Sequence, residues 1–161
     1  MEFPSQHTPN KLDGTLIHKA SQSINIPANV SKIAYIENID QLLHGEAKED
    51  IVIFTQFTDK KGATYQNHYF LLKQKDIRFP QVNIQHNITP KEGGFEIELE
   101  SDQFARAVFI SIGEQDNFFH DNYFDLLPGK KKIIAVDSKL SLSDIRKQIK
   151  INSLVDGFSP H

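Results

Sequence analysis

A chain of 161 residues has room for one domain or two small ones, and its 39% hydrophobic and 24% charged residues are typical of a globular protein. Its formal net charge of -3 argues against nucleic-acid binding, which needs a concentrated basic face, and its lack of cysteine excludes disulfides and thiolate metal sites. No apolar stretch approaches the roughly 20 residues of a membrane-spanning helix, and the first ten residues do not have the pattern of a signal peptide.

Taken in chain order, alternating and β-branched or aromatic residues predict a series of short strands. In the first half of the chain these are residues 23–26, 31–36, 51–57 and 68–72. In the second half they are residues 95–100, 105–112 and 132–136, and alternation also begins at Val82 and Ile84. Turn signals such as Glu92-Gly93-Gly94 and Pro128-Gly129 separate them. The spacing predicts an all-β protein, an antiparallel β-sandwich.

The clearest strand is FEIELE, residues 95–100. Phe95, Ile97 and Leu99 alternate with three glutamates, which predicts one buried face and one solvated acidic face. The glutamates could suggest calcium, but that ion needs six to eight oxygens that converge from loops. A solvated face is therefore the better interpretation.

Helical periodicity is confined to two places. Residues 39–45 predict one or two turns, with Gly45 as a left-handed stop. Near the C-terminus, SLSDIRKQIKI begins with a Ser141-to-Asp144 capping arrangement, and apolar residues recur at helical spacing as far as Ile149. We expect this second helix to place one apolar stripe on the sandwich.

A boundary is expected where the charged stretch LLKQKDIR ends at Phe79-Pro80. We assign residues 1–76 to a first sandwich and residues 77–161 to a second sandwich with the helix attached. The first half has too few predicted strands for an independent sandwich. We therefore expect it to be incomplete and to expose strand edges, through which a homodimer could form.

The sequence contains no catalytic constellation. Seven histidines are scattered, and no two have the spacing of a metal-binding pair. A glycine-rich phosphate loop, a nucleophile elbow and a Ser/His/Asp signature are all absent from the sequence. We expect no catalytic residue, no metal site and no cofactor in this chain.

The densest aromatic stretch is FFHDNYFDLLPGKKKIIAV, residues 118–136. Phe118, Phe119, Tyr123 and Phe124 could form a carbohydrate platform on which sugar rings stack. Alternation instead divides these rings between two faces of a strand. Asp121-Asn122 is a turn signal, because both side chains can bond to backbone two residues on, and Leu-Leu-Pro-Gly predicts a tight corner. We favour the structural corner over the platform.

Four separated segments follow one another in the order NHYFLLKQKDIRFPQVNI, GGFEIELESDQFARAVFI, DNYFDLLPGKKK and INSLVDGF. Together they resemble the C-terminal region of β-mannosidases of glycoside hydrolase family 2. The resemblance covers roughly residues 10–157. It departs from the family pattern at His120, where serine is usual, and at Lys130, where glutamate is usual.

The resemblance implies two immunoglobulin-like sandwiches that follow a catalytic (β/α)8 barrel, of which the first is only partly present here. It also implies a periplasmic or extracellular parent enzyme that hydrolyses terminal β-mannosides with retention, using two glutamates of the barrel. The acid/base glutamate of that family lies in an Asn-Glu doublet. This chain contains no such doublet, so no catalytic residue can be assigned.

Two functions follow from the resemblance and the aromatic stretch. The first is a non-catalytic accessory region that packs against the barrel of a β-mannosidase. The alternative is a carbohydrate-binding module for mannosides, with Phe118, Phe119, Tyr123 and Phe124 as the sugar-binding residues. Titration with manno-oligosaccharides would distinguish them.

Overall fold

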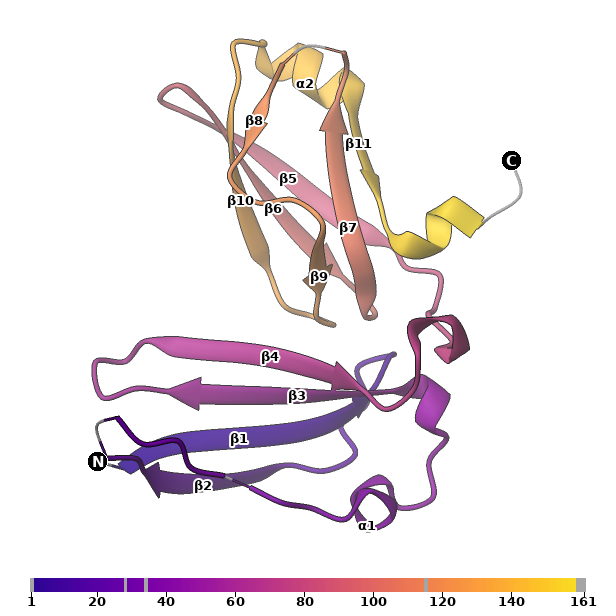
Figure 1. Ribbon diagram of the computed structural model, residues 1–161. Helices are drawn as coiled ribbons and strands as arrows, with labels where there is room; N and C mark the ends of the chain where they lie inside the picture. The colour runs from indigo at the N-terminus through magenta and orange to yellow at the C-terminus, as the bar shows by residue number, and fades with distance from the viewer. Residues whose placement is uncertain (1, 28, 34, 115, 159–161) are drawn as a thin grey trace. The chain divides into compact units, whose positions relative to one another are not determined.

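The computed structural model describes residues 2–27, 29–33, 35–114 and 116–158, and divides the chain into two compact units (Figure 1). The first unit is Met1–Arg78 and the second is Phe79–His161. All paired strands among the described residues are antiparallel. This confirms the all-β, antiparallel class that the alternation predicted, and the resemblance had implied that the sandwich is immunoglobulin-like.

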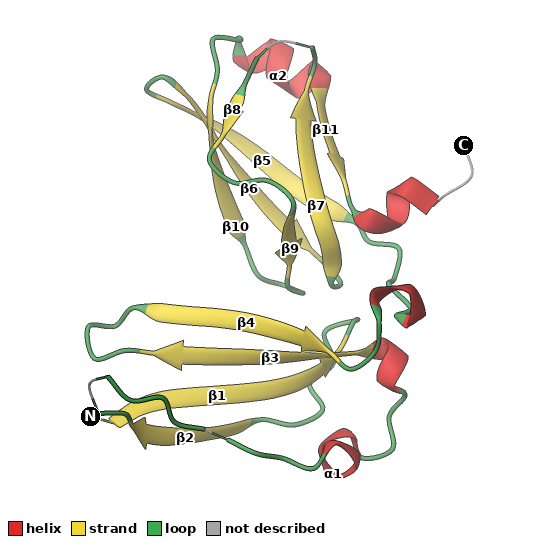
Figure 2. Ribbon diagram, in the orientation of Figure 1, coloured by secondary structure: helices red, strands yellow, loops and turns green. Residues whose placement is uncertain are grey.

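The first unit contains one four-stranded sheet in the order β2-β1-β3-β4 (Figure 2). Its strands are β1 (Glu2–Lys11), β2 (Ala20–Asn25), β3 (Ile51–Thr58) and β4 (Thr64–Phe70). Sequence reasoning missed β1, because Pro4 and Pro9 argue against a strand that pairs on both sides. The described residues of this unit form this one sheet, and its incompleteness as a sandwich stays a prediction.

The prediction of a strand at residues 31–36 is wrong. The described residues of this segment have no strand structure, and Ile33 and Ile36 are exposed. Alternation alone does not form a strand when no neighbouring strand is in register to accept its backbone hydrogen bonds. The strand predicted at residues 68–72 also lies earlier, at Thr64–Phe70.

The predicted first helix is confirmed as α1 (Ile39–Leu43). The Asn38 side chain accepts hydrogen bonds from the backbone N–H groups of Asp40, at 2.9 Å, and Gln41, at 3.3 Å. The chain becomes left-handed at His44, with φ of 51°, and remains so at Gly45, with φ of 85°. Two short 3-10 helices, Lys48–Asp50 and Gln74–Asp76, flank the strands β3 and β4.

The second unit is a sandwich of two sheets, β5-β6-β10-β8 and β11-β7-β9. The strands of the first sheet are β5 (Ile84–Lys91), β6 (Gly94–Ser101), β8 (Phe118–Phe119) and β10 (Lys132–Asp137). Those of the second are β7 (Ala105–Ile112), β9 (Phe124–Leu126) and β11 (Ile149–Asn152).

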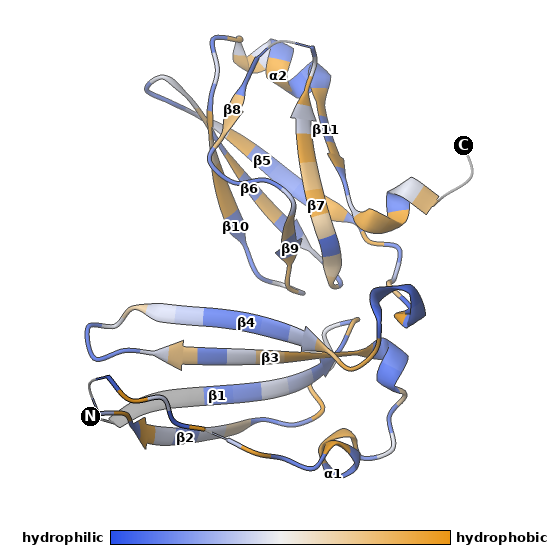
Figure 3. Ribbon diagram, viewed as in Figure 1, coloured by the Kyte–Doolittle hydropathy of each residue, from blue (hydrophilic) through white to orange (hydrophobic). Residues whose placement is uncertain are grey.

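The core of the second unit lies between these sheets. Phe95, Ile97 and Leu99 of β6 are buried, as the alternation predicted, and Ile110 of β7 is also fully buried. Figure 3 shows β7 as mostly hydrophobic and β4 of the first unit as hydrophilic along most of its length. The glutamates of β6 lie on the other face, where Lys131 pairs with Glu98 at 2.8 Å. They form the solvated acidic face that was expected.

The predicted C-terminal helix is shorter than expected. Helix α2 (Leu142–Gln148) begins with the Ser141 cap, whose hydroxyl oxygen accepts a hydrogen bond from the Asp144 N–H at 3.2 Å. Residues 149–152 then form β11 and pair with β7. Ile149 and Ile151 are two residues apart, which fits a strand, and pairing with β7 satisfies the backbone groups on the side of this edge strand that faces β7. A 3-10 helix, Leu154–Phe158, follows.

Candidate functional site

The aromatic stretch of the second unit forms a corner that is tied to β7. The Asn122 side chain replaces a strand residue, because its Oδ1 accepts from the Ile110 N–H at 2.9 Å and its Nδ2 donates to the Ile110 carbonyl at 2.9 Å. Asp121 pairs with Lys132 at 2.8 Å. Asn122 Oδ1 also accepts the adjacent Tyr123 N–H at 3.1 Å, but among the described residues neither side chain makes the predicted bond to backbone two residues on. A tertiary contact with β7 holds the corner instead.

The four rings proposed as a sugar platform do not form one exposed row. Phe124 is buried in the core, and Phe119 packs against the same core. Phe118 and Tyr123 are 62% and 68% exposed, respectively. Tyr123 stacks on Phe109 with ring centroids 4.7 Å apart, whereas Phe118 makes a T-shaped contact with His120. The rings are thus divided between the interior and two separate surface positions.

A pocket of about 430 Å³ lies beside Tyr123. Its polar rim includes Asp156, but that carboxylate already accepts hydrogen bonds from the N–H and the hydroxyl of Ser153. The aromatic surface of the pocket is the Tyr123–Phe109 stack. Of the four rings predicted from the sequence, only Tyr123 lines this pocket.

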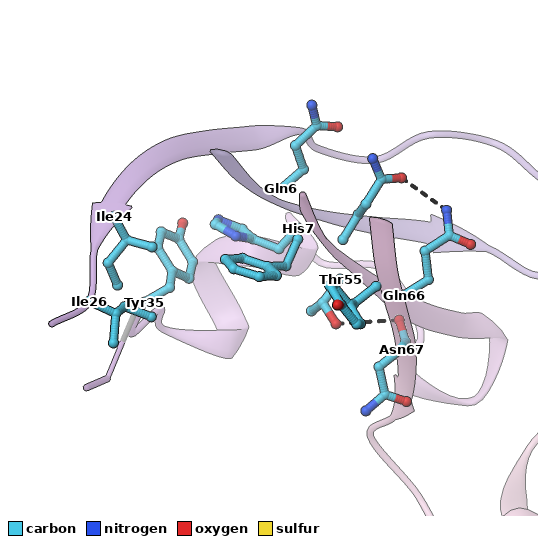
Figure 4. A pocket seen from close by; sticks show the side chains of 11 residues that line it. Gln6, His7, Ile24, Ile26, Tyr35, Thr55, Gln66 and Asn67 are labelled. Carbon is cyan, nitrogen blue, oxygen red and sulfur yellow. Dashed lines mark hydrogen bonds between the residues drawn. The ribbon is translucent and has the colours of Figure 1, made fainter. Parts of the chain in front are cut away.

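The first unit has a second pocket, of about 310 Å³, on one face of its sheet (Figure 4). Strand register places His7 beside Thr55 and Thr55 beside Asn67, so that these three side chains share the face. Phe57 and Tyr65 form the next cross-strand pair on this face, with ring centroids 5.9 Å apart. Sequence reasoning missed this site. Only the alternation of Tyr65, Asn67 and Tyr69 in β4 could have indicated it.

His7 is the most unusual polar group in this pocket. His7 is buried, with an exposure of 7%, and its Nε2 has no hydrogen-bond partner among the described residues. Its ring lies against Tyr35, with centroids 3.4 Å apart. Burial lowers the pKa of His7, the carboxylate of Glu37 opposes that change, and His18 lowers the pKa further. A hydrogen bond to Glu37 raises the pKa of Tyr35.

The depressed pKa of His7 predicts a pH dependence of stability. Below the ordinary histidine pKa of 6.5 the unfolded chain takes up a proton that the folded chain does not. The free energy of unfolding of the first unit should therefore fall from pH 7.5 downward through 6.5, and level off below the folded-state pKa of His7. Urea denaturation at each pH, monitored through the NMR signals of this unit, would measure the change in its free energy of unfolding.

His7→Phe should remove this component of the pH dependence, because phenylalanine does not titrate. His86→Phe, at an exposed position of β5 in the second unit, is the matched control and should leave it in place. An unchanged pH dependence in the His7→Phe protein would contradict the assignment.

Over the described ranges, 2–27, 29–33, 35–114 and 116–158, no three His, Asp or Glu side chains gather as a metal site would require. Within those same ranges, no helix is long and apolar enough to cross a membrane.

Two family profiles match the chain in succession. Residues 10–76 match the mannosidase Ig/CBM-like domain, and residues 79–157 match the mannosidase Ig-fold domain. Each match lies within one structural unit.

Among curated proteins, the chain is similar to a mouse β-mannosidase, with 27% identity over 144 residues. It is also 28% identical to β-mannosidase A of Aspergillus oryzae over 137 residues. These matches cover 86% and 77% of this chain, but only 16% and 15% of the relatives. The chain therefore spans about a sixth of the length of these enzymes.

Among solved structures, the chain is similar to a β-D-mannosidase from Dictyoglomus thermophilum, with a TM-score of 0.71 and 20% identity. The match covers 94% of this chain and 18% of that one. An exo-chitosanase from Amycolatopsis orientalis follows, with a TM-score of 0.50, 14% identity, and coverage of 94% of this chain and 22% of that one. At these identities the structures show a shared fold.

Proposed function

The chain belongs to the immunoglobulin-like domains of the C-terminal region of β-mannosidases, and from this we propose that it is a non-catalytic accessory region of such an enzyme. Its function is structural: it packs against a catalytic domain and contributes to the stability of the whole enzyme. Hydrolysis of terminal β-mannosides is assigned to that other domain.

The observation that carries this proposal is that two family profiles match the chain one after the other. Residues 10–76 and 79–157 match two different β-mannosidase domain families, one for each unit. The relatives are about six times longer, so most of their length lies outside the region that resembles this chain. A catalytic domain of the parent enzyme is the partner that this arrangement favours.

The solvated acidic face of the second unit also carries two exposed apolar side chains that such packing could cover. On the outer face of the sheet β5-β6-β10-β8, Ile133 is 58% exposed and Phe118 is 62% exposed. Leaving large apolar side chains in water is unfavourable, and covering them against another domain recovers that free energy. In the first unit, β2 and β4 form the edges of the sheet, and edge-mediated homodimers remain a prediction for light scattering to test.

The proposal predicts that the purified chain does not hydrolyse p-nitrophenyl β-D-mannopyranoside. It also predicts that this chain, substituted for the matching 18% of the Dictyoglomus enzyme, gives an active fusion with a higher Tm than the enzyme without that region. Ile133→Ser in the fusion should lower that gain in Tm. Release of p-nitrophenol by the chain alone, above a heat-treated control, would contradict the non-catalytic assignment.

A further inference from the structure

The connection between β2 and α1, residues 26–38, contacts the sheet of the first unit through Tyr35. The described residues of this connection, 26–27, 29–33 and 35–38, have no strand or helix structure. In the part of the chain that the structure describes, no hydrogen bond joins 29–33 or 35–37 to the sheet. The Tyr35 ring instead lies against His7 of β1, with ring centroids 3.4 Å apart (Figure 4). This ring contact therefore attaches residues 35–37 to the sheet.

The buried position of His7 favours the neutral imidazole. A protonated ring carries an N–H on both of its nitrogens. The Nε2 atom of His7 is buried and has no hydrogen-bond partner among the described residues. Protonation in place would thus leave a charged N–H buried without an acceptor, which is more costly than leaving a neutral group unpaired. A protonated His7 gains free energy when this nitrogen reaches water.

Three titratable groups face His7 from the described residues around it. Burial has the largest effect and lowers the pKa of His7, the Glu37 carboxylate opposes that change, and His18 adds to it. The carboxylate of Glu37 is already engaged by the hydroxyl of Tyr35, whose pKa it raises. The residues opposite His7 on the two neighbouring strands do not titrate: they are Ala20 and Thr55. The nearest carboxylate is therefore shared with the same tyrosine that covers the imidazole.

We propose that the β2–α1 connection is an acid-sensitive strap, in which protonation of His7 releases Tyr35 and detaches residues 35–37 while the sheet stays folded. The two ends of the connection are held independently of His7. Ile24 of β2 is buried just before its start, and the Asn38 cap and the buried Leu42 of α1 hold its end. Release of the middle is thus a local change. It is a conformational property separate from the packing role.

Proton linkage gives the direction and the largest size of the effect. With Tyr35 attached, burial holds the pKa of His7 below its ordinary value of 6.5, and with Tyr35 released the pKa returns toward that value. Release therefore takes up a proton below pH 6.5. The ratio of released to attached strap should rise as the pH falls, by at most about 25-fold between pH 7 and pH 5. Above about pH 7.5 it should be constant.

The test is NMR spectroscopy of the whole chain between pH 8 and pH 5, with ¹³C-labelled tyrosine and histidine rings. At pH 8 the ring current of His7 should displace the Tyr35 resonances. As the pH falls, they should move toward the positions of an exposed tyrosine, and the nuclear Overhauser contacts between Tyr35 and His7 should weaken in parallel. The amide signals of β1 and β3 should stay in place, because the sheet remains folded.

Two histidine variants form a matched pair. His7→Phe keeps a planar ring against Tyr35 and does not titrate, so Tyr35 should remain attached over the whole pH range. His18→Gln removes the other nearby imidazole and should leave the pH-dependent release in place. Normal amide dispersion at pH 8 would show that each variant is folded.

Glu37→Gln separates the proposal from a competing response to acid. The amide can still accept from the Tyr35 hydroxyl, but the charge that favours a protonated His7 in the attached state is gone. Release at pH 5 should therefore increase in this variant. In the competing response, the carboxylate turns from Tyr35 to pair with protonated His7, and the same substitution would abolish the pH-dependent shift.

Four outcomes would overturn the proposal. The first is a full Tyr35–His7 contact at pH 5, and the second is an unchanged pH response in the His7→Phe protein. The third is loss of the response in the Glu37→Gln protein. The fourth is loss of the β1 and β3 amide signals together with the ring contact, because the whole unit would then unfold. None of these outcomes affects the mannosidase fusion experiment, which tests the packing role.

Discussion

Replacing Ile110 with alanine is expected to lower the free energy of unfolding of the second unit by about 2–5 kcal/mol. Ile110 is fully buried on β7, the central strand of the sheet β11-β7-β9. The substitution removes apolar contacts from the core and leaves a cavity that the two facing sheets cannot close completely. Urea denaturation, monitored through the NMR signals of the second unit, would measure the loss in its free energy of unfolding.

Ile133→Ala is the matched control for this experiment. It removes the same atoms from the same residue type in a strand of the same unit, but Ile133 is 58% exposed. Its effect should be within about 0.5 kcal/mol. If the two variants were equally stable, the core described for the second unit would be wrong.

Replacing Asp125 with alanine should have the second large effect, about 2–3 kcal/mol. The cause is a β-bulge. Ala105 pairs with Leu126 and Val108 pairs with Phe124, so β7 has one residue more than β9 between these pairs. Ala107 lies in the bulge with φ of 49°, and its N–H donates to Asp125 Oδ1 at 2.7 Å. The second carboxylate oxygen of Asp125 accepts from Arg106.

The expected loss is smaller than the 3–5 kcal/mol of a fully buried ion pair, because the Arg106 side chain is 29% exposed and water can reach it. Asp125→Asn should fall between wild type and Asp125→Ala, since the amide oxygen can still accept from Ala107 N–H. Asp137→Ala, at a side chain that is 64% exposed, is the control and should change stability by less than about 0.5 kcal/mol. A loss as large for Asp137→Ala as for Asp125→Ala would show that the bulge is not what the carboxylate stabilises.

The strands of the second unit could be predicted because alternation is a local property. Phe95, Ile97 and Leu99 repeat every second residue, and a strand that buries one face requires this spacing. The helix at residues 142–148 could be predicted from its cap. Its end could not, because residues 149–152 form a strand only where β7 is available to pair with them.

The corner was predicted, but its mechanism was not. The sequence around Asn122 indicates a turn, and turn residues bond to nearby backbone in isolation. In the structure the amide bonds to Ile110, which is 12 residues distant. The carboxylate of Asp125 supports a bulge in another strand in the same way. Contacts between strands decide the partners of these side chains, and no local pattern carries that information.

The sequence by itself determined the all-β class, the acidic face of β6, the short helices and the absence of a recognisable catalytic motif. These features depend on residue type and on spacing over a few residues. Together the two set the local conformation and determine which face of a helix or strand is buried. Only the tertiary structure decided that β1 pairs on both sides despite its prolines, and that His7 lies against Tyr35 and faces a pocket with Tyr65. Those residues are brought together by strand register, and register depends on pairing between segments that are far apart in the chain.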